Sequence, residues 1–406
     1  MKKSLFALAL SAFALGAAEF VMMGILPQTA HAMKVSIPVA GNFISSYAIG
    51  VCVGTLILVF GRKIPPKRLI IIFIALIIVG NLLSALSVNA PMLIVSRFIA
   101  GLPHGAFFGT ATLIAKSVAE PGKETKAVSM MVTGQTLANM LGVPAGTLLA
   151  EHLTWRMTFA SLCAWAAVAL VLSLVWLPDV PAIADAGIGG QFAFLRRRAP
   201  WLILGAVFFG NAGIFCWWSY VSPWLIKVGG YASESIPTMM MLAGFGMVIG
   251  GLIGGNIADH WRHAGTASIG QILSAVGLLL AFLVPGTTLT TAILTFWISF
   301  GLFFVSSPQQ ILMVDAGKGG GELIGGAAVQ VAFNLGNAVG SIIGGMSLTA
   351  TSGNYHTPAL SGIPMALLAV ALLIVYSVRH ETHTGALQRM KLIHLPEVGS
   401  KPLDRG

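Results

Sequence analysis

Long apolar runs are the feature that most restricts the fold of this chain of 406 residues. A helix that crosses a bilayer needs roughly 20 consecutive apolar residues. Charged residues make up only 9% of the chain, whereas soluble domains contain about 25%. The sequence therefore predicts an all-α polytopic membrane protein. Twelve predicted transmembrane helices lie at about residues 4–26, 39–60, 68–88, 92–115, 127–150, 156–177, 201–225, 236–258, 266–285, 288–311, 323–349 and 359–378.

The first run begins like a secretory signal peptide, "MKKSLFALALSAFALGAAEF", but it is too long to be one. Its apolar stretch continues from about Ser4 to Leu26, and a signal-peptide core has roughly 7–15 residues. We therefore expect this segment to be retained as the first transmembrane helix, with Glu19 inside it.

The lysines and arginines predict the orientation of the helices, because basic residues favour cytoplasmic loops. With the N-terminus in the cytoplasm, 19 of them fall on the inner side, 3 on the outer side, and Arg97 lies within a helix. The net charge of +10 thus indicates cytoplasmic loops rather than a nucleic-acid partner. Both termini are expected in the cytoplasm, and the protein is expected to be a multi-pass monomer of the bacterial inner membrane.

The longest polar interruption between helices divides the chain into two halves. It covers residues 178–200 and is rich in Pro, Gly, Asp and Arg, which suits a cytoplasmic linker. We expect a six-helix bundle in residues 1–177, a second in 201–380, and a polar cytoplasmic tail in 381–406.

The two halves share a pattern of amides. Residues Gln135, Asn139 and Gly142 of the fifth run have the same spacing as Gln330, Asn334 and Asn337 of the eleventh, at a constant offset of 195. Each set lies on one helical face. Two like-oriented halves predict a transporter whose substrate site lies between them, near the middle of the bilayer.

Four segments resemble motifs of the major facilitator superfamily. They are "GTLILVFGRK" (54–63), "SRFIAGLPHGAFFG" (96–109), "GQTLANMLGVPAG" (134–146) and "TWRMTF" (154–159). Together they are most similar to twelve-helix drug:H⁺ antiporters of the arabinose-efflux-permease-like branch. The resemblance covers residues 1 to about 380, and it implies two six-helix bundles that alternate in access.

The resemblance also implies a set of gating and conformational residues: Gly54, Gly61, Arg62, Lys63, Gly142, Pro144, Gly146, Asp259 and Arg262. The chain departs from the family pattern at Leu58, where an aspartate is usual, and at Arg262, where a glycine is expected. The family acid helps to hold the outward-facing state, so this lock is in doubt here. Gly142, Pro144 and Gly146 also suit close helix packing.

Three ionisable residues are candidates for proton coupling: Glu19, Arg97 and His104. Glu19 is the only carboxylate well inside a predicted helix, where a charged acid costs roughly 2.5–3.5 kcal/mol. Burial disfavours its charged form, so it could be neutral in one state and charged in another. Arg97 is the expected counter-charge, and His104 follows it two helical turns later. The alternative is that these groups only tie neighbouring helices together.

The candidates for substrate binding are amides and aromatic residues within predicted helices: Tyr47, Gln135, Asn139, Asn211, Trp217, Tyr220, Gln330, Asn334 and Asn337. Amides bind hydroxyl-rich or amide-rich ligands without adding charge, although they also join neighbouring helices. Trp224 is expected in the aromatic belt at the membrane surface. The three cysteines are expected to be small buried hydrophobes, with no spacing typical of a metal site.

These observations predict a secondary transporter that exports a small molecule in exchange for protons. No cofactor and no metal is expected, because the proton gradient supplies the energy. An enzyme is excluded by the lack of a nucleotide-binding glycine loop, an HExxH zinc motif or a GxSxG elbow. Two alternatives stay open, namely a uniporter or proton-coupled importer on the same fold and a non-transporting membrane receptor.

Overall fold

A computed structural model describes residues 2–60, 64–121, 124–180, 193–317 and 322–381, and these residues are almost entirely helical. The first half contains α1 (Lys2–Gly24), α2 (Leu26–Ala32), α3 (Ile37–Ala40), α4 (Asn42–Phe60), α5 (Pro66–Ala85), α6 (Ala90–Ser117), α7 (Glu124–Leu137), the π-helical turn η1 (Ala138–Gly142), α8 (Val143–His152) and α9 (Trp155–Trp176). The second half contains η2 (Ala193–Arg196), α11 (Arg198–Trp218), α12 (Val221–Lys227), η3 (Ser233–Ser235), α13 (Ile236–His260), α14 (His263–Leu283), α15 (Thr288–Phe304), α16 (Ser306–Ala316), α17 (Glu322–Ala350), α18 (Thr357–Tyr376) and η4 (Ser377–Glu381).

The predicted transmembrane helices are found in this architecture. Within the described residues, eleven helical segments are long and apolar enough to cross a membrane. The remaining predicted helix, at 127–150, corresponds to α7, η1 and α8, which follow one another without a gap from Glu124 to His152. The expectation of an all-α polytopic fold is therefore confirmed, with eleven of the twelve predicted helices found as candidate membrane spans among the described residues and the twelfth found as a continuous helical segment.

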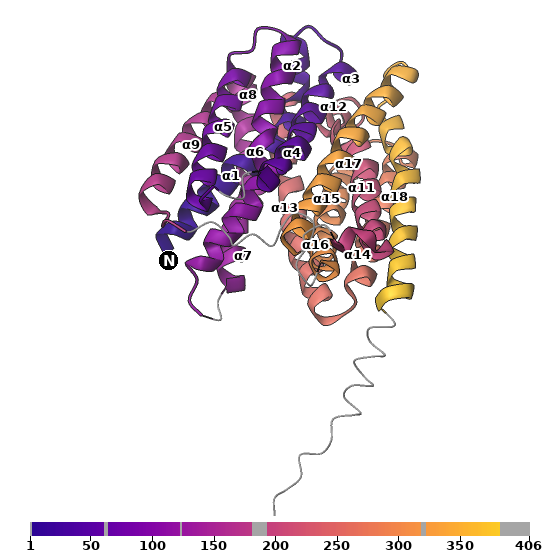
Figure 1. Cartoon of the computed structure of the whole chain (residues 1–406). Coiled ribbons are helices and arrows are strands. Elements are labelled where there is room, and N and C mark those ends of the chain that lie inside the picture. Colours follow the sequence, from indigo (N-terminus) through magenta and orange to yellow (C-terminus); the bar gives the residue numbers. More distant parts are fainter. Residues whose placement is uncertain (1, 61–63, 122–123, 181–192, 318–321, 382–406) are drawn as a thin grey trace, which may run out of the picture.

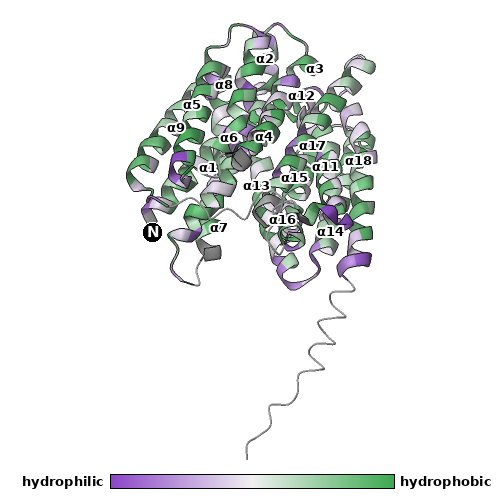
Figure 2. Ribbon diagram, in the orientation of Figure 1, coloured by the Kyte–Doolittle hydropathy of each residue, from purple (hydrophilic) through white to green (hydrophobic). Residues whose placement is uncertain are grey.

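The helices form two bundles, one from each half of the chain (Figure 1). Helices α1 to α9 pack among themselves, as do α11 to α18, and α4 and α17 meet where the two bundles join. Apolar residues make up most of the length of the outer helices, and many hydrophilic residues lie toward the two ends of the bundles (Figure 2). Large apolar side chains such as Val175, Leu252 and Ile293 are exposed, as lipid contact requires.

Prolines account for two of the breaks between paired helices. The chain leaves helical geometry at Ile25, two residues before Pro27, and again at Ser219 and Tyr220, shortly before Pro223. A proline lacks the N–H that continues a helix and disfavours helical geometry in the residue before it. Pro103, in contrast, lies within α6, which continues past it to Ser117.

Equivalent glycine contacts hold a pair of helices together in each half. A Cβ atom on Gly50 or Gly54 of α4 would overlap the carbonyl oxygen of Phe98 or Leu102 of α6. Gly250 and Gly254 of α13, 200 residues later, meet Phe300 and Phe304 of α15 in the same way. We call these contacts the glycine seams. Only glycine permits such close backbone approach, so each seam fixes two helices as one unit.

Two serine side chains form hydrogen bonds between the two bundles. We call the end where α1 begins, α9 ends and α11 begins the linker side. Toward the other end, Ser45 Oγ donates to the carbonyl oxygen of Ala338 at 3.2 Å, and Ser341 Oγ donates to that of Gly41 at 3.0 Å. These bonds join α17 to α4 and to Gly41 just before it, and they hold the two halves together toward the end opposite the linker side.

The cysteines are less buried than the sequence suggests. All three are free, and Cys216 is buried, but Cys52 and Cys163 are only half-buried. Cys52 lies on α4 with its Sγ atom 3.5 Å from the carbonyl oxygen of Val331 on α17. It therefore lies at the junction of the two bundles. No cluster of His, Cys, Asp and Glu suited to a metal occurs in the described part of the chain.

Candidate functional site

Glu19 lies deep in the first bundle, on α1, with 4% of its surface exposed. Its Oε2 atom is 3.5 Å from Nε2 of His104 on α6. Its Oε1 atom has no hydrogen-bond partner. An unpaired carboxylate oxygen in an apolar environment is costly when the group is charged, so a proton on Glu19 would relieve this cost.

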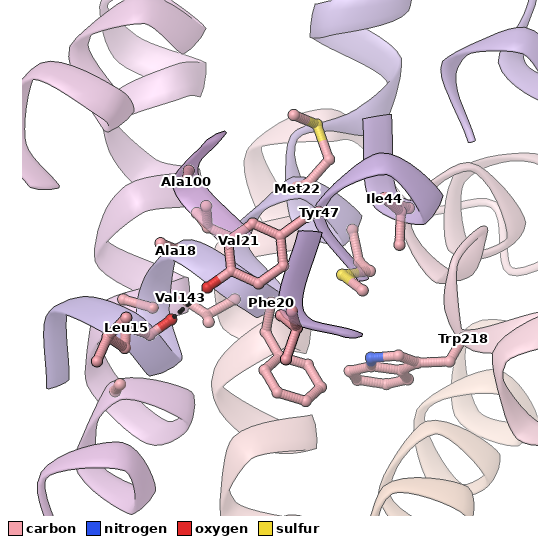
Figure 3. Close-up of a cluster of buried hydrophobic side chains, with 14 of the residues drawn as sticks. Leu15, Ala18, Phe20, Val21, Met22, Ile44, Tyr47, Ala100, Val143 and Trp218 are labelled. Carbon is pink, nitrogen blue, oxygen red and sulfur yellow. Dashed lines mark hydrogen bonds between the residues drawn. The ribbon is translucent and has the colours of Figure 1, made fainter. Parts of the chain in front are cut away.

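His104 is connected onward to Tyr47 of α4. The Tyr47 hydroxyl is 2.9 Å from Nδ1 of His104 and 3.3 Å from the carbonyl oxygen of Leu15, one helical turn before Glu19 (Figure 3). The imidazole thus lies between the carboxylate and a phenol. Tyr47 was predicted to bind substrate, but the structure places it beside the ionisable residues instead.

Arg97 is fully buried beside α1, where its Nη2 atom donates to the carbonyl oxygen of Ala18 at 2.7 Å. Its guanidinium also lies over the Tyr47 ring, 4.4 Å from the centroid, and over the Phe159 ring at 5.5 Å. The carboxylate contact of Glu19 is therefore with His104, and not with Arg97 as the sequence suggests. Arg97 nevertheless places its positive charge next to the backbone of the residue before Glu19.

A second feature of the site is a cavity of about 70 Å³ between the two bundles, in the linker-side half of the helices. Its walls are made of three kinds of residue. They are the aromatic residues Phe20, Phe303 and Phe333, the polar residues Gln135, Asn211, Ser306, Gln309, Gln310 and Gln330, and the aliphatic residues Val207, Leu302, Val305 and Val329.

Helix α1 separates the ionisable residues from the cavity. Leu15 and Glu19 form one stripe along α1, which contacts Tyr47 and His104. Gly16 and Phe20 form the next stripe, which faces Gln135 and the cavity. Successive residues of a helix are separated by about 100° of rotation, so the two stripes face different neighbours. In Figure 3 the Phe20 ring points toward Trp218 and away from the Leu15–Tyr47 bond.

Among the predicted substrate residues, the structure brings Gln135, Asn211 and Gln330 to the cavity. The other amides do not line it. Asn139 is buried in the π-helical turn η1 without partners for its side-chain atoms, and Asn334 donates to the carbonyl oxygen of Gln330 at 3.1 Å. Asn337 is buried on α17 with its Oδ1 unpaired.

The predicted aromatic residues of α11 and α12 pack within the protein. Trp217 lies 5.1 Å from Trp224, measured between ring centroids. Tyr220 donates its hydroxyl to the carbonyl oxygen of Ser341 at 2.8 Å. Trp224 is 1% exposed, so its assignment to a membrane-surface belt is wrong. The run of aromatics is explained by burial against α17 and its neighbours.

Sequence reasoning missed several cavity residues. Phe20, next to Glu19, lies 6.2 Å from Phe303 and 6.3 Å from Phe215 between ring centroids. Gln309 lines the cavity and is 3% exposed, with its Nε2 atom unpaired. The one signal for Gln309 in the sequence is its position beside Pro308, after the break at Val305.

The predicted gating residues fall into three groups. Gly61, Arg62 and Lys63 lie outside the described residues. Gly54 belongs to a glycine seam, and Gly142 and Gly146 lie against Phe13 and Val21 of α1, with Pro144 buried between them. Asp259 and Arg262 are exposed on the linker side, at the end of α13 and just before α14. Their part in gating stays a prediction.

Comparison with known proteins places this architecture in context. The profile described as Major Facilitator Superfamily matches residues 8–327. The chain is 40% identical over 404 residues to AraJ of Escherichia coli (strain K12), which covers 99% of this chain and 100% of that protein. It is 33% identical over 382 residues to the inner membrane transport protein YdhP of the same strain, covering 94% and 97%.

Two further similarities are more distant. Over 397 residues the chain is 28% identical to a chloramphenicol resistance protein of Streptomyces lividans, covering 95% and 98%. Its fold matches a bacterial homolog of the human lysosomal transporter Spinster, solved in an inward-facing and unoccupied conformation. That match has a TM-score of 0.70 at 16% identity and covers 92% of this chain and 95% of the other. These matches are to transporters, which confirms the prediction that the chain is not an enzyme.

Proposed function

Because this chain belongs to the major facilitator superfamily of transporters, we propose that it exports a small molecule from the bacterial cytoplasm across the inner membrane in exchange for protons. The buried carboxylate of Glu19, 3.5 Å from His104 and with one oxygen unpaired, carries this proposal. The protein acts as a monomer, and the proton gradient is its energy source.

The positions of the bundle contacts support a conformation open toward the cytoplasm. The distribution of basic residues predicts that the linker side is cytoplasmic. The serine bonds between the two halves lie toward the other side, and the cavity lies in the linker-side half. The cavity therefore lies nearer the cytoplasmic side, from which it would open to substrate when the bundles separate there.

The proton step follows from the environment of Glu19. When charged, the carboxylate is attracted to the fixed positive charge of Arg97, which holds α1 against α6. When protonated, it loses this attraction, and α1 is free to shift. Because Phe20 of the same helix lines the cavity, a shift of α1 changes the substrate site. Proton and substrate thus influence each other through the position of α1.

The names of the relatives support export. One relative, at 28% identity, is a chloramphenicol resistance protein, and resistance of this kind fits removal of a compound from the cell. We therefore use chloramphenicol as the first probe.

The test is transport of labelled chloramphenicol by Glu19→Gln protein in proteoliposomes. Wild-type protein should accumulate the probe against its gradient when a pH gradient is imposed, and Glu19→Gln protein should only exchange it. Glu151→Gln is the matched control, since Glu151 is half-buried at the end of α8 and accepts a bond from Gln28 at 2.9 Å. Uphill transport by the Glu19→Gln protein would falsify the coupling role. Exchange by the wild type without any response to pH would instead identify a uniporter.

A further inference from the structure

The cavity between the bundles has polar walls without charge. Among the described residues that line it, six are polar, and all six are amides or a hydroxyl: Gln135, Asn211, Ser306, Gln309, Gln310 and Gln330. Amides can donate and accept hydrogen bonds, but they cannot neutralise an ion.

Two of these side chains have atoms free for a ligand. The Nδ2 atom of Asn211 donates to the carbonyl oxygen of Val207 at 2.7 Å, and its Oδ1 atom is unpaired. On Gln309 the Nε2 atom is unpaired. Both side chains are 3% exposed. Buried polar atoms without partners are rare in proteins, so this pair offers one acceptor and one donor to a ligand.

The charged groups of the first bundle are not available to the cavity. Glu19 and His104 contact each other on the neighbouring stripe of α1, and Arg97 is enclosed by Ala18, Tyr47 and Phe159. The cavity side of α1 instead presents Phe20, and Phe303 and Phe333 complete an aromatic wall.

We propose that the exported substrate is an uncharged molecule that carries hydrogen-bond donors and acceptors beside an apolar or aromatic ring. This inference rests on the proposed transport function. A cation or an anion in the cavity would lose its hydration without gaining a counter-charge, which is much more costly than burial of a hydrogen-bonded neutral group. The amides satisfy the polar groups of the substrate, and the three phenylalanines contact its ring.

The cavity as it stands is too small for a drug-sized substrate. Pockets for drug-sized ligands have volumes of roughly 300–1,000 Å³, whereas this cavity holds about 70 Å³. The bundles must therefore separate at the linker side to admit a substrate of that size. Closure around it then pairs the amides of both halves with the same molecule.

A consequence for energetics follows from the separation of the two sites. If each transport cycle exchanges one proton for one neutral molecule, it moves one net positive charge inward. Membrane potential then drives export even without a pH difference, because one charge crossing 100 mV is worth about 2.3 kcal/mol. Exchange of one proton for a monovalent cation would move no net charge.

The first experiment compares matched probes on the purified protein. Chloramphenicol is uncharged and carries an amide, two hydroxyls and an aromatic ring, and its deacylated amine keeps the ring and hydroxyls but is cationic. We expect chloramphenicol to raise the melting temperature and the amine to bind roughly 10-fold more weakly or worse. The same comparison is made for other pairs of an uncharged amide and its cationic amine. Equal or stronger binding by the amines, or no binding by any uncharged member, overturns the proposal.

The second experiment places a charge in the cavity. Gln309→Glu should weaken binding of chloramphenicol and improve binding of the amine by roughly 10-fold. Asn256→Asp is the matched control, since Asn256 is exposed near the end of α13 and does not line the cavity. If Gln309→Glu changes neither affinity while the protein stays folded by its melting curve, the cavity is not the recognition site.

The third experiment measures flux in preloaded proteoliposomes at equal pH on both sides. An inside-negative potassium diffusion potential should accelerate release of chloramphenicol by the wild type. Glu19→Gln protein should still bind the probe, because Glu19 does not line the cavity, and it should lose this acceleration. If that protein keeps the acceleration, the proposed proton site is wrong while the substrate class stands. If the wild type binds chloramphenicol but its release ignores the potential, the neutral-for-proton exchange is wrong.

Discussion

The two bundles have the same helical plan but different chemistry in their interiors. Helix α6 of the first bundle buries Arg97 and His104 against Glu19 of α1. In the second bundle, the equivalent of α6 is the α15–α16 pair, and there the buried polar residues are uncharged, such as Ser299 and Gln309. Both bundles nevertheless keep a glycine seam.

This difference indicates a division of labour between two copies of one scaffold. The glycine seams occur in both halves, which indicates that the fold of each bundle requires this close contact between two helices. Among the described residues, buried Glu, Arg and His side chains occur in the first half only, so the second half folds without them. The second half contributes most of the cavity wall through residues such as Asn211, Phe303 and Gln330. Under the proposed function, proton coupling depends mainly on the first half and substrate recognition mainly on the second.

The largest effect is expected from bulky substitutions in the glycine seams. Gly54→Leu and Gly254→Leu would place side chains where the carbonyl oxygens of Leu102 and Phe304 lie. Overpacking typically costs about 1–3 kcal/mol and more where backbone must move. We expect both variants to lose the monodisperse peak in size-exclusion chromatography. Gly251→Leu is the control, because its nearest neighbour is the Phe303 oxygen at 3.9 Å. If one of the two variants keeps its monodisperse peak and the other does not, the two glycine seams are not structurally equivalent.

The next effect concerns Arg97. Arg97→Met removes the donor to Ala18 and leaves Glu19 without a nearby fixed positive charge, so the melting temperature should fall. Addition of Glu19→Gln should restore part of the loss, with a coupling energy of about 1–3 kcal/mol. As a comparison, Gln271→Met removes a buried polar side chain from the second half. Its cost should simply add to that of Glu19→Gln, and strong coupling there would contradict the division between the halves.

A smaller effect is expected from the hydroxyl of Tyr47. Tyr47→Phe removes the contact with His104 Nδ1 and leaves the aromatic ring under Arg97. Loss of one such bond is worth about 1 kcal/mol, so proton-driven transport should slow by roughly fivefold while probe binding stays unchanged. Tyr220→Phe removes a hydroxyl bond within the second half and should leave the response to pH unaltered. Equal slowing by the two variants would argue against a role for Tyr47 in proton transfer.

The smallest effect is expected where the two halves touch. Ser45→Ala and Ser341→Ala each remove one bond between the two halves, worth about 0.5–1.5 kcal/mol. The population open at the end opposite the linker side should rise with each change. Distances between spin labels at Ser36 and Asn354, both exposed at that end, measure this shift. Ser347→Ala removes a bond within α17 only and should leave the distances as they are.

Much of the fold could be predicted because its determinants are local. The lengths of the apolar runs predict where the membrane helices lie, and prolines predict two of the breaks between them. The proton candidates were also visible, since a carboxylate such as Glu19 is conspicuous inside an apolar run. The seams were partly visible as glycine-rich stretches, but their partners are backbone oxygens, which have no signature in the sequence.

The cavity was harder to predict. In an apolar helix the residue types do not reveal which face, or which level along the helix axis, lines a cavity. In the predicted amide stripe of α17, Gln330 lines the cavity and Asn337 does not, and the substrate role of both stays a prediction. Seven residues of helix span about 10 Å, so a stripe extends well beyond a small cavity. Phe20 and Phe303 look like ordinary core residues until the bundles are placed side by side. The burial of Trp224 was also not visible in the sequence, because it depends on the packing of its ring against Trp217.

Cys52 gives the protein a natural chemical reporter. Its thiol lies against the α17 backbone at Val331, at the junction between the halves. The thiol is half-buried, and separation of the halves would uncover the side of Sγ that faces Val331. The alkylation rate of Cys52 under transport conditions should therefore rise with the fraction of time that the junction is open. This measurement needs no engineered label near the helices that move.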